Sequence, residues 1–144
     1  MNTIVLNTLN GATTEHALPL DCVTPTHAGS HDGLFALGGD VDGVDAIEAV
    51  VTTGKTLWGD SRRKAAPWGY FSMSGAGEGL FTVHGASQSW SYPFTVRSKG
   101  VSRAQTGRGI FENYLAFTYR NIAGVDFILD RLEIMPAVYN TRRI

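Results

Sequence analysis

The sequence is poor in cysteine, contains no long apolar run and has no basic residue before Lys55. Cys22 is the only cysteine among the 144 residues, so no disulfide can form within the chain, and we expect a buried, inert thiol. No apolar run approaches the ~18 residues that a membrane-spanning helix needs. The segment Met1–Asn7 also lacks a positively charged region. These absences predict a protein without a signal peptide or transmembrane segment.

The two sections of the chain differ in charge. Residues 1–54 carry seven acids and no Lys or Arg, whereas residues 55–144 carry six acids and all twelve basic residues, so −7 and +6 give the net charge of −1. An acidic surface on one copy of the chain can therefore meet a basic surface on the next copy, which favours a homo-oligomer. The alternative is that the two sections neutralise each other within one fold.

Glycine is frequent, with 17 residues, and it divides the chain into short segments that favour strands. The clearest strand covers residues 89–97, where four large apolar side chains share one face: Trp90, Tyr92, Phe94 and Val96. Trp90 is expected in the core. Pro93 cannot donate to a ladder, so this strand should lie at a sheet edge or contain a bulge. Leu80–His84 should pair with it as a hairpin with a longer loop.

The last long segment changes its apolar phase, and two other segments are ambiguous. Residues 127 and 129 are apolar, then residues 132 and 134, which predicts a bulge near Asp130. Residues 46–53 fit a short helix after the capping-box residues Asp45 and Glu48, or a strand, which the β-branched residues favour. Residues 110–119 fit a helical stripe or a strand face, and the β-rich neighbourhood favours the strand.

About nine short strands separated by turns predict an all-β fold. Such a pattern is typical of an antiparallel β-sandwich or jelly roll, here as a single domain over residues 1–144 with at most one short helix. The expected strands are Thr3–Asn7, His16–Leu20, Leu34–Leu37, Ala46–Thr52, Gly69–Met73, Gly79–His84, Ser89–Arg97, Ile110–Tyr119 and Phe127–Met135. The segments 1–10 and 137–144 are expected to form short terminal arms.

No motif indicates a catalytic or metal centre. The acidic run over residues 39–45 departs from the calcium-loop pattern, so no cofactor is expected, with calcium as a weaker alternative held by Asp40, Asp42, Asp45 or Asp130. Residues 85–89 read GASQS and end in Ser, where a nucleophile elbow has Gly. We therefore expect no enzyme activity.

Two basic clusters and two tryptophans are candidates for a protein interface. Both clusters carry charge that could meet an acidic protein surface, and Trp58 and Trp68 bracket the loop that holds the first cluster. A near-neutral charge balance makes nucleic acid an unlikely partner. The interface candidates are Trp58, Arg62, Arg63, Lys64, Trp68, Arg142 and Arg143.

Residues 114–119 (YLAFTY) and 124–136 (GVDFILDRLEIMP) resemble the closing strands of jelly-roll domains, including carbohydrate-binding modules. In such modules a closing-strand carboxylate helps to hold a structural calcium, which the resemblance implies for Asp130 if a second carboxylate approaches it. A carbohydrate-binding module is therefore an alternative function, and a small enzyme with an unrecognised site is a third.

In size, in Gly, Thr and Ser content and in its lack of an export signal or catalytic constellation, the chain resembles the decoration (cement) proteins of tailed-bacteriophage capsids. The resemblance implies a structural protein that is made in the host cytoplasm and located on the virion. Its partner would be a protein shell such as a major capsid protein, and no membrane is expected as a partner. Binding to the assembled shell alone would stabilise that shell by linkage.

Overall fold

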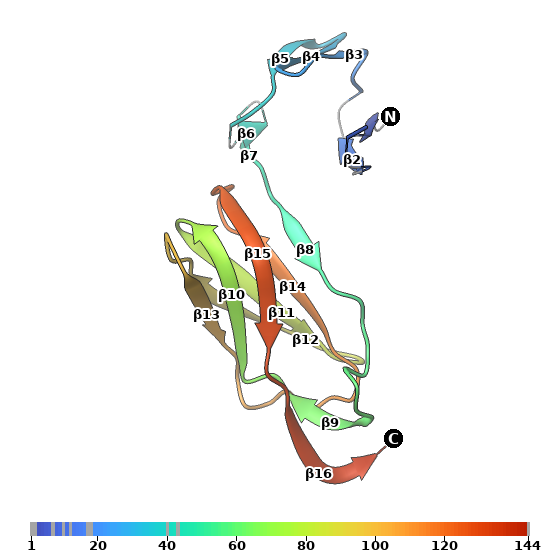
Figure 1. Cartoon of the computed structure of the whole chain (residues 1–144), viewed down its shortest axis with the longest axis vertical. Helices are drawn as coiled ribbons and strands as arrows, with labels where there is room; N and C mark the ends of the chain where they lie inside the picture. The colour runs from blue at the N-terminus through green and yellow to red at the C-terminus, as the bar shows by residue number, and fades with distance from the viewer. Residues whose placement is uncertain are drawn as a thin grey trace. The chain divides into compact units, whose positions relative to one another are not determined.

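The computed structural model describes residues 3–6, 8, 9, 11, 13–16, 19–39, 41, 42 and 44–143, and within them it contains strands and no helix (Figure 1). The predicted all-β class is confirmed. The chain divides into two compact units, Met1–Gly39 and Asp40–Ile144, which are described separately below as the N-terminal unit and the sandwich unit. The single domain over 1–144 stays a prediction, because compactness does not test whether a unit folds alone.

The N-terminal unit consists of small antiparallel sheets. β1 (Thr3–Leu6) pairs with β2 (Thr13–His16), and β4 (His27–Ser30) lies between β3 (Cys22–Val23) and β5 (Gly33–Ala36). Strands were predicted at 3–7, 16–20 and 34–37; the second begins and ends earlier than expected, while residues 17 and 18 lie outside the described residues. Cys22 is exposed, so the prediction of a buried thiol is wrong.

The sandwich unit contains two larger antiparallel sheets. One has the order β13 (Val101–Gln105), β10 (Trp68–Gly75), β15 (Phe127–Ile134). The other has the order β12 (Ser89–Thr95), β11 (Glu78–His84), β14 (Ala116–Asn121), β8 (Val50–Thr52). The prediction of an antiparallel sandwich is confirmed, and its jelly-roll variant stays a prediction.

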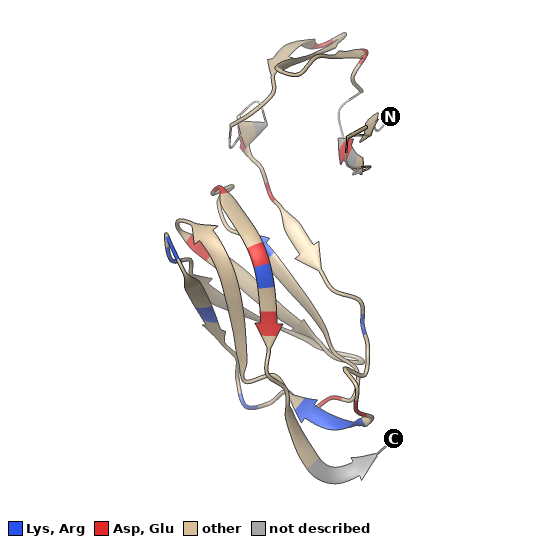
Figure 2. Cartoon of the chain, viewed as in Figure 1, with Lys and Arg blue, Asp and Glu red and all other residues tan. Residues whose placement is uncertain are grey.

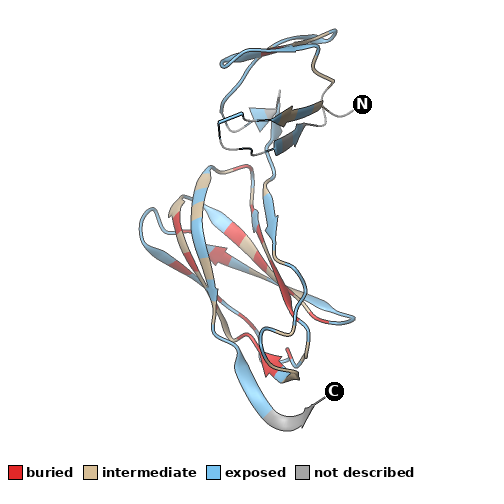
Figure 3. Ribbon diagram, turned by 45° about the vertical axis from the view of Figure 1, so that its right-hand side comes forward, coloured by how far each residue is buried: buried red, intermediate tan, exposed pale blue. Residues whose placement is uncertain are grey.

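Aromatic side chains from both sheets interlock in the core between them. The ring of Phe71 on β10 packs edge-on against Phe81 at 5.3 Å between centroids and stacks on Phe94 at 4.7 Å. Tyr119 on β14 contacts Phe71 at 5.6 Å, and burial raises the pKa of its hydroxyl. Figure 3 shows buried residues on the strands of these two sheets, with others on β9. Trp90 packs partly buried against this core, as expected.

Two shorter pairings complete the sandwich unit. β6 (Val41–Asp42) pairs with β7 (Asp45–Ala46), and β9 (Arg62–Ala65) pairs with β16 (Ala137–Arg143). Both segments expected to be terminal arms therefore contain paired strands, β1 in 1–10 and β16 in 137–144. Their use as arms on a partner stays a prediction.

Three local predictions are confirmed in the sandwich unit. β12, which contains Pro93, is an edge strand, and it forms the expected hairpin with β11 across a four-residue connection closed by the Gly85 N–H bond to the Gln88 carbonyl at 2.8 Å. The register of β10 against β15 shifts so that Ser72 faces Arg131 and Met73 faces Leu129, which leaves Asp130 as the bulged residue.

The two ambiguous segments form partial strands. Residues 45–46 and 50–52 are strands, and residues 116–121 form β14, whereas residues 110–115 make only isolated bridges. The buried Asn121 holds residues 47–49, which lie between β7 and β8. Its carboxamide accepts the Ala49 N–H at 2.8 Å and donates to the Ile47 carbonyl at 3.0 Å, so these backbone groups bond to a side chain and not to a strand.

Candidate functional site

The pairing of β9 with β16 brings together the two basic clusters of the sequence. Arg62 on β9 lies opposite Arg143 on β16, although 80 residues separate them along the chain. Figure 2 shows β9 in blue beside β16. The side chains of Arg142 and Arg143 lie outside the described part of the chain, so we define the basic end by Arg62, Arg63 and the backbone of β16. Sequence spacing alone could not reveal this juxtaposition.

Lys64 does not belong to any exposed surface, which corrects its expected place in an interface. Its side chain is 0 % exposed, and the ammonium donates to the carbonyl oxygens of Asp60 at 2.6 Å, Arg62 at 3.0 Å and Asn113 at 2.9 Å. An ammonium has three N–H donors, so all are used. Desolvation lowers the pKa of Lys64, Asp60 opposes that shift and Arg62 adds to it. Lys64 thus connects β9 to the loops that contain Asp60 and Asn113 through buried hydrogen bonds.

Arg62 is engaged by Asp60 in a two-point contact. The guanidinium donates through Nη2 to Asp60 Oδ2 at 2.6 Å and through Nε at 2.9 Å, and the Arg62 backbone N–H donates to Oδ1 at 2.8 Å. These hydrogen bonds lower the pKa of Asp60 to about 2 and raise that of Arg62. Much of the Arg62 charge is therefore used within the chain.

The exposed Arg63 side chain lies over an exposed pair of aromatic rings, Phe111 and Tyr139. Its guanidinium lies 5.2 Å from the centroid of the Phe111 ring, and Phe111 meets Tyr139 of β16 edge-on at 4.7 Å. Both rings are partly exposed. An exposed cation beside aromatic surface is typical of protein contact sites, so Arg63 keeps its expected place as an interface candidate.

Trp58 occupies a tight turn in a strained conformation. Its φ of 49° lies in the left-handed region that bulky residues avoid, and the Asp60 N–H closes the turn on the Leu57 carbonyl at 3.2 Å. The indole N–H donates to the Leu115 carbonyl at 2.8 Å, and the ring packs on Phe117. At 43 % exposure, part of Trp58 remains open to a partner.

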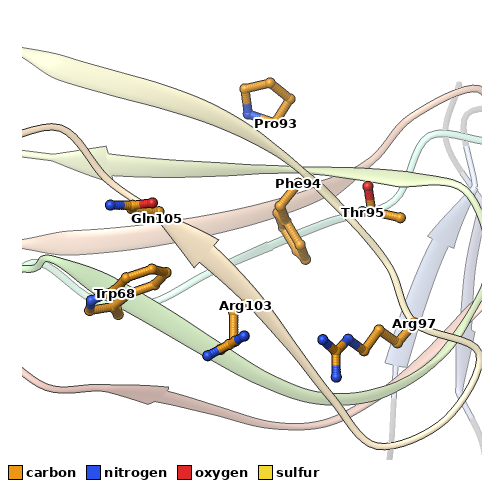
Figure 4. Close-up of a pocket in the computed structure, with 7 residues that line it drawn as sticks. All are labelled: Trp68, Pro93, Phe94, Thr95, Arg97, Arg103 and Gln105. Carbon is orange, nitrogen blue, oxygen red and sulfur yellow. The ribbon is translucent and has the colours of Figure 1, made fainter.

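A groove of about 450 Å³ lies along the edge where β12 approaches β13 (Figure 4). The lining side chains come from β10, β12, β13 and the segment after β12: Trp68, Pro93, Thr95, Arg97, Arg103 and Gln105, with Phe94 behind them from the core. The guanidinium carbon of Arg103 lies 6.0 Å from the centroid of the Trp68 ring. Among the described residues no carboxylate lines the groove, so the charge of this lining is positive.

The sequence identified Trp68 as a candidate but not Arg103 and Gln105, because strand β13 was not predicted; Arg97 closed the predicted strand 89–97 without being a candidate. The inward residues of β13, Ser102 and Ala104, are buried but small, so they give no apolar alternation. The outward residues Val101, Arg103 and Gln105 do alternate with them, which was the available signal. The basic strand β9 was not predicted because its buried residues, Lys64 and Ala65, are adjacent and do not alternate with exposed ones.

The candidate calcium ligands do not form a metal site among the described residues. Within the described part of the chain, no group of three His, Cys, Asp or Glu side chains could hold an ion, and Asp45 and Asp130 join no such group. Asp40 and the side chain of Asp42 lie outside it. The calcium expectation therefore stays untested.

A chain of polar side chains that the sequence did not predict crosses the outer face of the four-stranded sheet. His84 bonds Ser89 through Nδ1 at 2.8 Å and Thr118 through Nε2 at 2.8 Å, and Thr118 meets Thr52 at 2.9 Å. A hydroxyl can act as a nucleophile when a neighbouring imidazole acts as its base and a carboxylate orients that imidazole. Here both ring nitrogens of His84 bond to hydroxyl groups, and neither bonds to a carboxylate. The arrangement fits cross-strand stabilisation.

These features define an all-β sandwich protein with a cationic groove and a basic end. The described residues include no helix with the length and apolar character to cross a membrane. Comparison of the chain with protein-family models, with curated proteins and with solved structures finds no match.

Proposed function

We propose that the chain is a non-catalytic structural protein that binds an assembled protein shell, in the manner of a capsid decoration protein, and that the N-terminal unit docks on the shell. One observation carries the proposal. Among the described residues of this unit, Ala28 is the only buried hydrophobic residue, while Ile4 and Leu34 are 72 % and 74 % exposed. Four further large apolar residues of the unit are also exposed: Leu6, Leu9, Val23 and Leu37.

Ordering a chain costs roughly 1–2 kcal/mol per residue in backbone entropy. Burial of apolar surface offsets this cost by roughly 25 cal/mol per Å², and one buried alanine supplies little of it. A partner that covers the exposed leucines and isoleucine would supply the missing burial. The N-terminal unit is therefore suited to a surface that receives it, which supports a docking role.

The charge of this region specifies the partner's chemistry. The N-terminal unit, residues 1–39, holds three acids and no Lys or Arg, and all three acids are exposed: Glu15, Asp21 and Asp32. The receiving surface should thus be apolar with basic residues at its rim. A shell repeats such a surface many times, and a protein that binds only the assembled form stabilises it by mass action. A protein in this role would lie on the outside of a virion.

The same charges support contact between copies of the chain. The basic end of the sandwich unit, with Arg63 exposed, complements the acids of residues 1–54 on a neighbouring copy. Neighbouring copies on one shell would then bind in a common register, which supports the proposed homo-oligomer.

The test is cosedimentation of the purified full chain with assembled capsids of the virus that encodes it, compared with the dissociated capsid subunits. We expect binding to capsids alone, and a higher temperature for heat disruption of capsids that carry the chain. A triple variant, Ile4→Ser, Leu6→Ser and Leu34→Ser, should lose binding. It should keep its sandwich unit because all three side chains are exposed.

The matched control replaces two exposed apolar residues of the sandwich unit, Val101→Ser and Ile128→Ser. This control should bind capsids as the unmodified chain does. A full chain that stays in the supernatant, or a triple variant that sediments as well as the control, would contradict the proposal.

A further inference from the structure

We propose that the groove between β12 and β13 binds a saccharide that carries a carboxylate group. This inference goes beyond shell binding and does not rest on it, because the groove belongs to the sandwich unit and the docking residues belong to the N-terminal unit.

The groove offers two cations without a competing anion. Arg97 and Arg103 both line it, no carboxylate does, and neither arginine takes part in a salt bridge of the described residues. Figure 4 shows the Arg97 side chain reaching from the segment after β12 toward β13, the strand that carries Arg103. Guanidinium groups bind carboxylates through paired N–H donors. The site is thus suited to a planar oxyanion.

Neighbouring groups hold the backbone of Arg97 and the guanidinium of Arg103. The Arg97 backbone N–H donates to the Oγ of Ser102 at 2.9 Å, and Ser102 is fully buried, so the segment after β12 is fixed to β13. Arg103 lies over the Trp68 ring, which makes Trp68 a positioning residue for its guanidinium. Holding the Arg103 cation in advance lowers the entropy lost when an anion binds.

The rest of the lining matches a sugar. Gln105 offers an amide that both donates and accepts, Thr95 offers a hydroxyl, and Trp68 adds apolar surface. A volume of about 450 Å³ lies within the range of small-molecule sites. Hydroxyl groups of a sugar ring can bond the amide and hydroxyl while its carboxylate bonds the arginines.

Two other anionic polymers fit the groove less well. A peptide would add as a strand along the edge of β12, but Pro93 lacks the N–H that this pairing needs. A nucleic acid builds its affinity from many neutralised phosphates and stacked bases, whereas the groove offers two arginines and one tryptophan. The saccharide is therefore the favoured ligand.

The experiment is calorimetric titration of the full chain with two carboxylated probes, a galacturonate tetrasaccharide and a disialic acid. Further titrations use maltotetraose, sodium sulfate, tetraglutamate and tetrathymidylate. We expect at least one carboxylated saccharide to bind in the millimolar range or tighter, and the other four compounds to bind at least about tenfold more weakly. Arg97→Gln and Arg103→Gln should each weaken saccharide binding about tenfold or more, because each removes a charge-assisted hydrogen bond.

Arg108→Gln is the matched control, since Arg108 is exposed and does not line the groove. It should bind as the unmodified chain does, and circular dichroism should show all three variants folded. Absence of binding by both carboxylated saccharides, equal binding of any of the other four compounds, or unchanged affinity in both groove variants would overturn the inference. Each of these results leaves capsid cosedimentation unaffected, so the two proposals fail separately.

Discussion

The N-terminal unit and the sandwich unit are built from the same element, the short antiparallel strand, but they differ in what their strands bury. In the sandwich unit, Phe71, Phe81, Phe117 and Tyr119 are at most 1 % exposed and lie in ring contact with one another. In the described part of the N-terminal unit, Ala28 alone among hydrophobic residues is buried.

The difference shows that strand pairing does not by itself form a core. Backbone ladders satisfy N–H and C=O groups in both units, but only two facing sheets with large side chains exclude water between them. A unit that pairs its backbone without burying its side chains keeps apolar surface available for a partner. Substitutions in the two units should therefore differ in their effect on stability.

Removing one core ring should affect stability far more than removing one apolar residue of the N-terminal unit. Phe71 contacts the rings of Phe81, Phe94 and Tyr119, so Phe71→Ala should lower the free energy of unfolding by about 4 kcal/mol. Ile4→Ala should change it by less than about 0.5 kcal/mol. Urea unfolding followed by circular dichroism measures both. A large cost for Ile4→Ala would show that the N-terminal unit has a core of its own in solution.

Lys64 extends the comparison to a buried charge. Lys64→Met keeps most of the apolar stem but leaves the carbonyl oxygens of Asp60, Arg62 and Asn113 without their donor. We expect a loss of about 3 kcal/mol, because buried acceptors without partners and a broken polar tie are costly. Thermal unfolding under the same buffer conditions measures it.

Arg63→Met is the control for Lys64, since it removes a neighbouring charge that lies on the surface over Phe111. Its loss should be at most about 1 kcal/mol, the size of an exposed cation–π contact. Equal losses for the two variants would mean that Lys64 is solvated.

A smaller, stabilising effect is expected at a turn of the sandwich unit. Ala123 is exposed and has a φ of 58°, a left-handed conformation that costs a residue with a Cβ atom. Ala123→Gly should therefore raise the free energy of unfolding by about 0.5–1 kcal/mol. Ala76→Gly, in a loop position whose φ is not positive, should instead lower it slightly. Denaturant midpoints of the two variants that shift in the same direction would contradict the turn conformation.

The sequence predicted those parts of the fold that large residues specify. Trp90, Tyr92 and Phe94 identified β12, Pro93 placed it at an edge, and the change of apolar phase located the bulge at Asp130. Each of these signals comes from one strand and its own residues. Such local information is carried by residue type and spacing.

The candidate sites were less accessible because they depend on pairings between distant segments. The contact of β9 with β16 joins residues 62–65 to residues 137–143, and the groove joins β10, β12 and β13. Nothing in the local pattern encodes either neighbour relation. Lys64 was predicted on a surface because lysine is rarely buried, and only the three carbonyls around it explain the exception.

The smallest effect concerns acid titration of the ion pair beside Lys64. Hydrogen bonds from the Arg62 side chain, and then from its backbone N–H, lower the pKa of Asp60 from 3.8 to about 2. Since the folded pKa lies below the unfolded one, the carboxylate contributes stability above the unfolded pKa and loses that contribution as pH falls from 3.8 toward 2. Asp60→Asn lacks this contribution, so its unfolding free energy should fall less steeply over that range.

The control Asp130→Asn, at the exposed bulge, should keep the slope of the unmodified chain. Because the pair is partly exposed, solvent screens it and the difference in slope should be modest. Parallel curves for Asp60→Asn and Asp130→Asn would show that the contact between Asp60 and Arg62 does not form in solution.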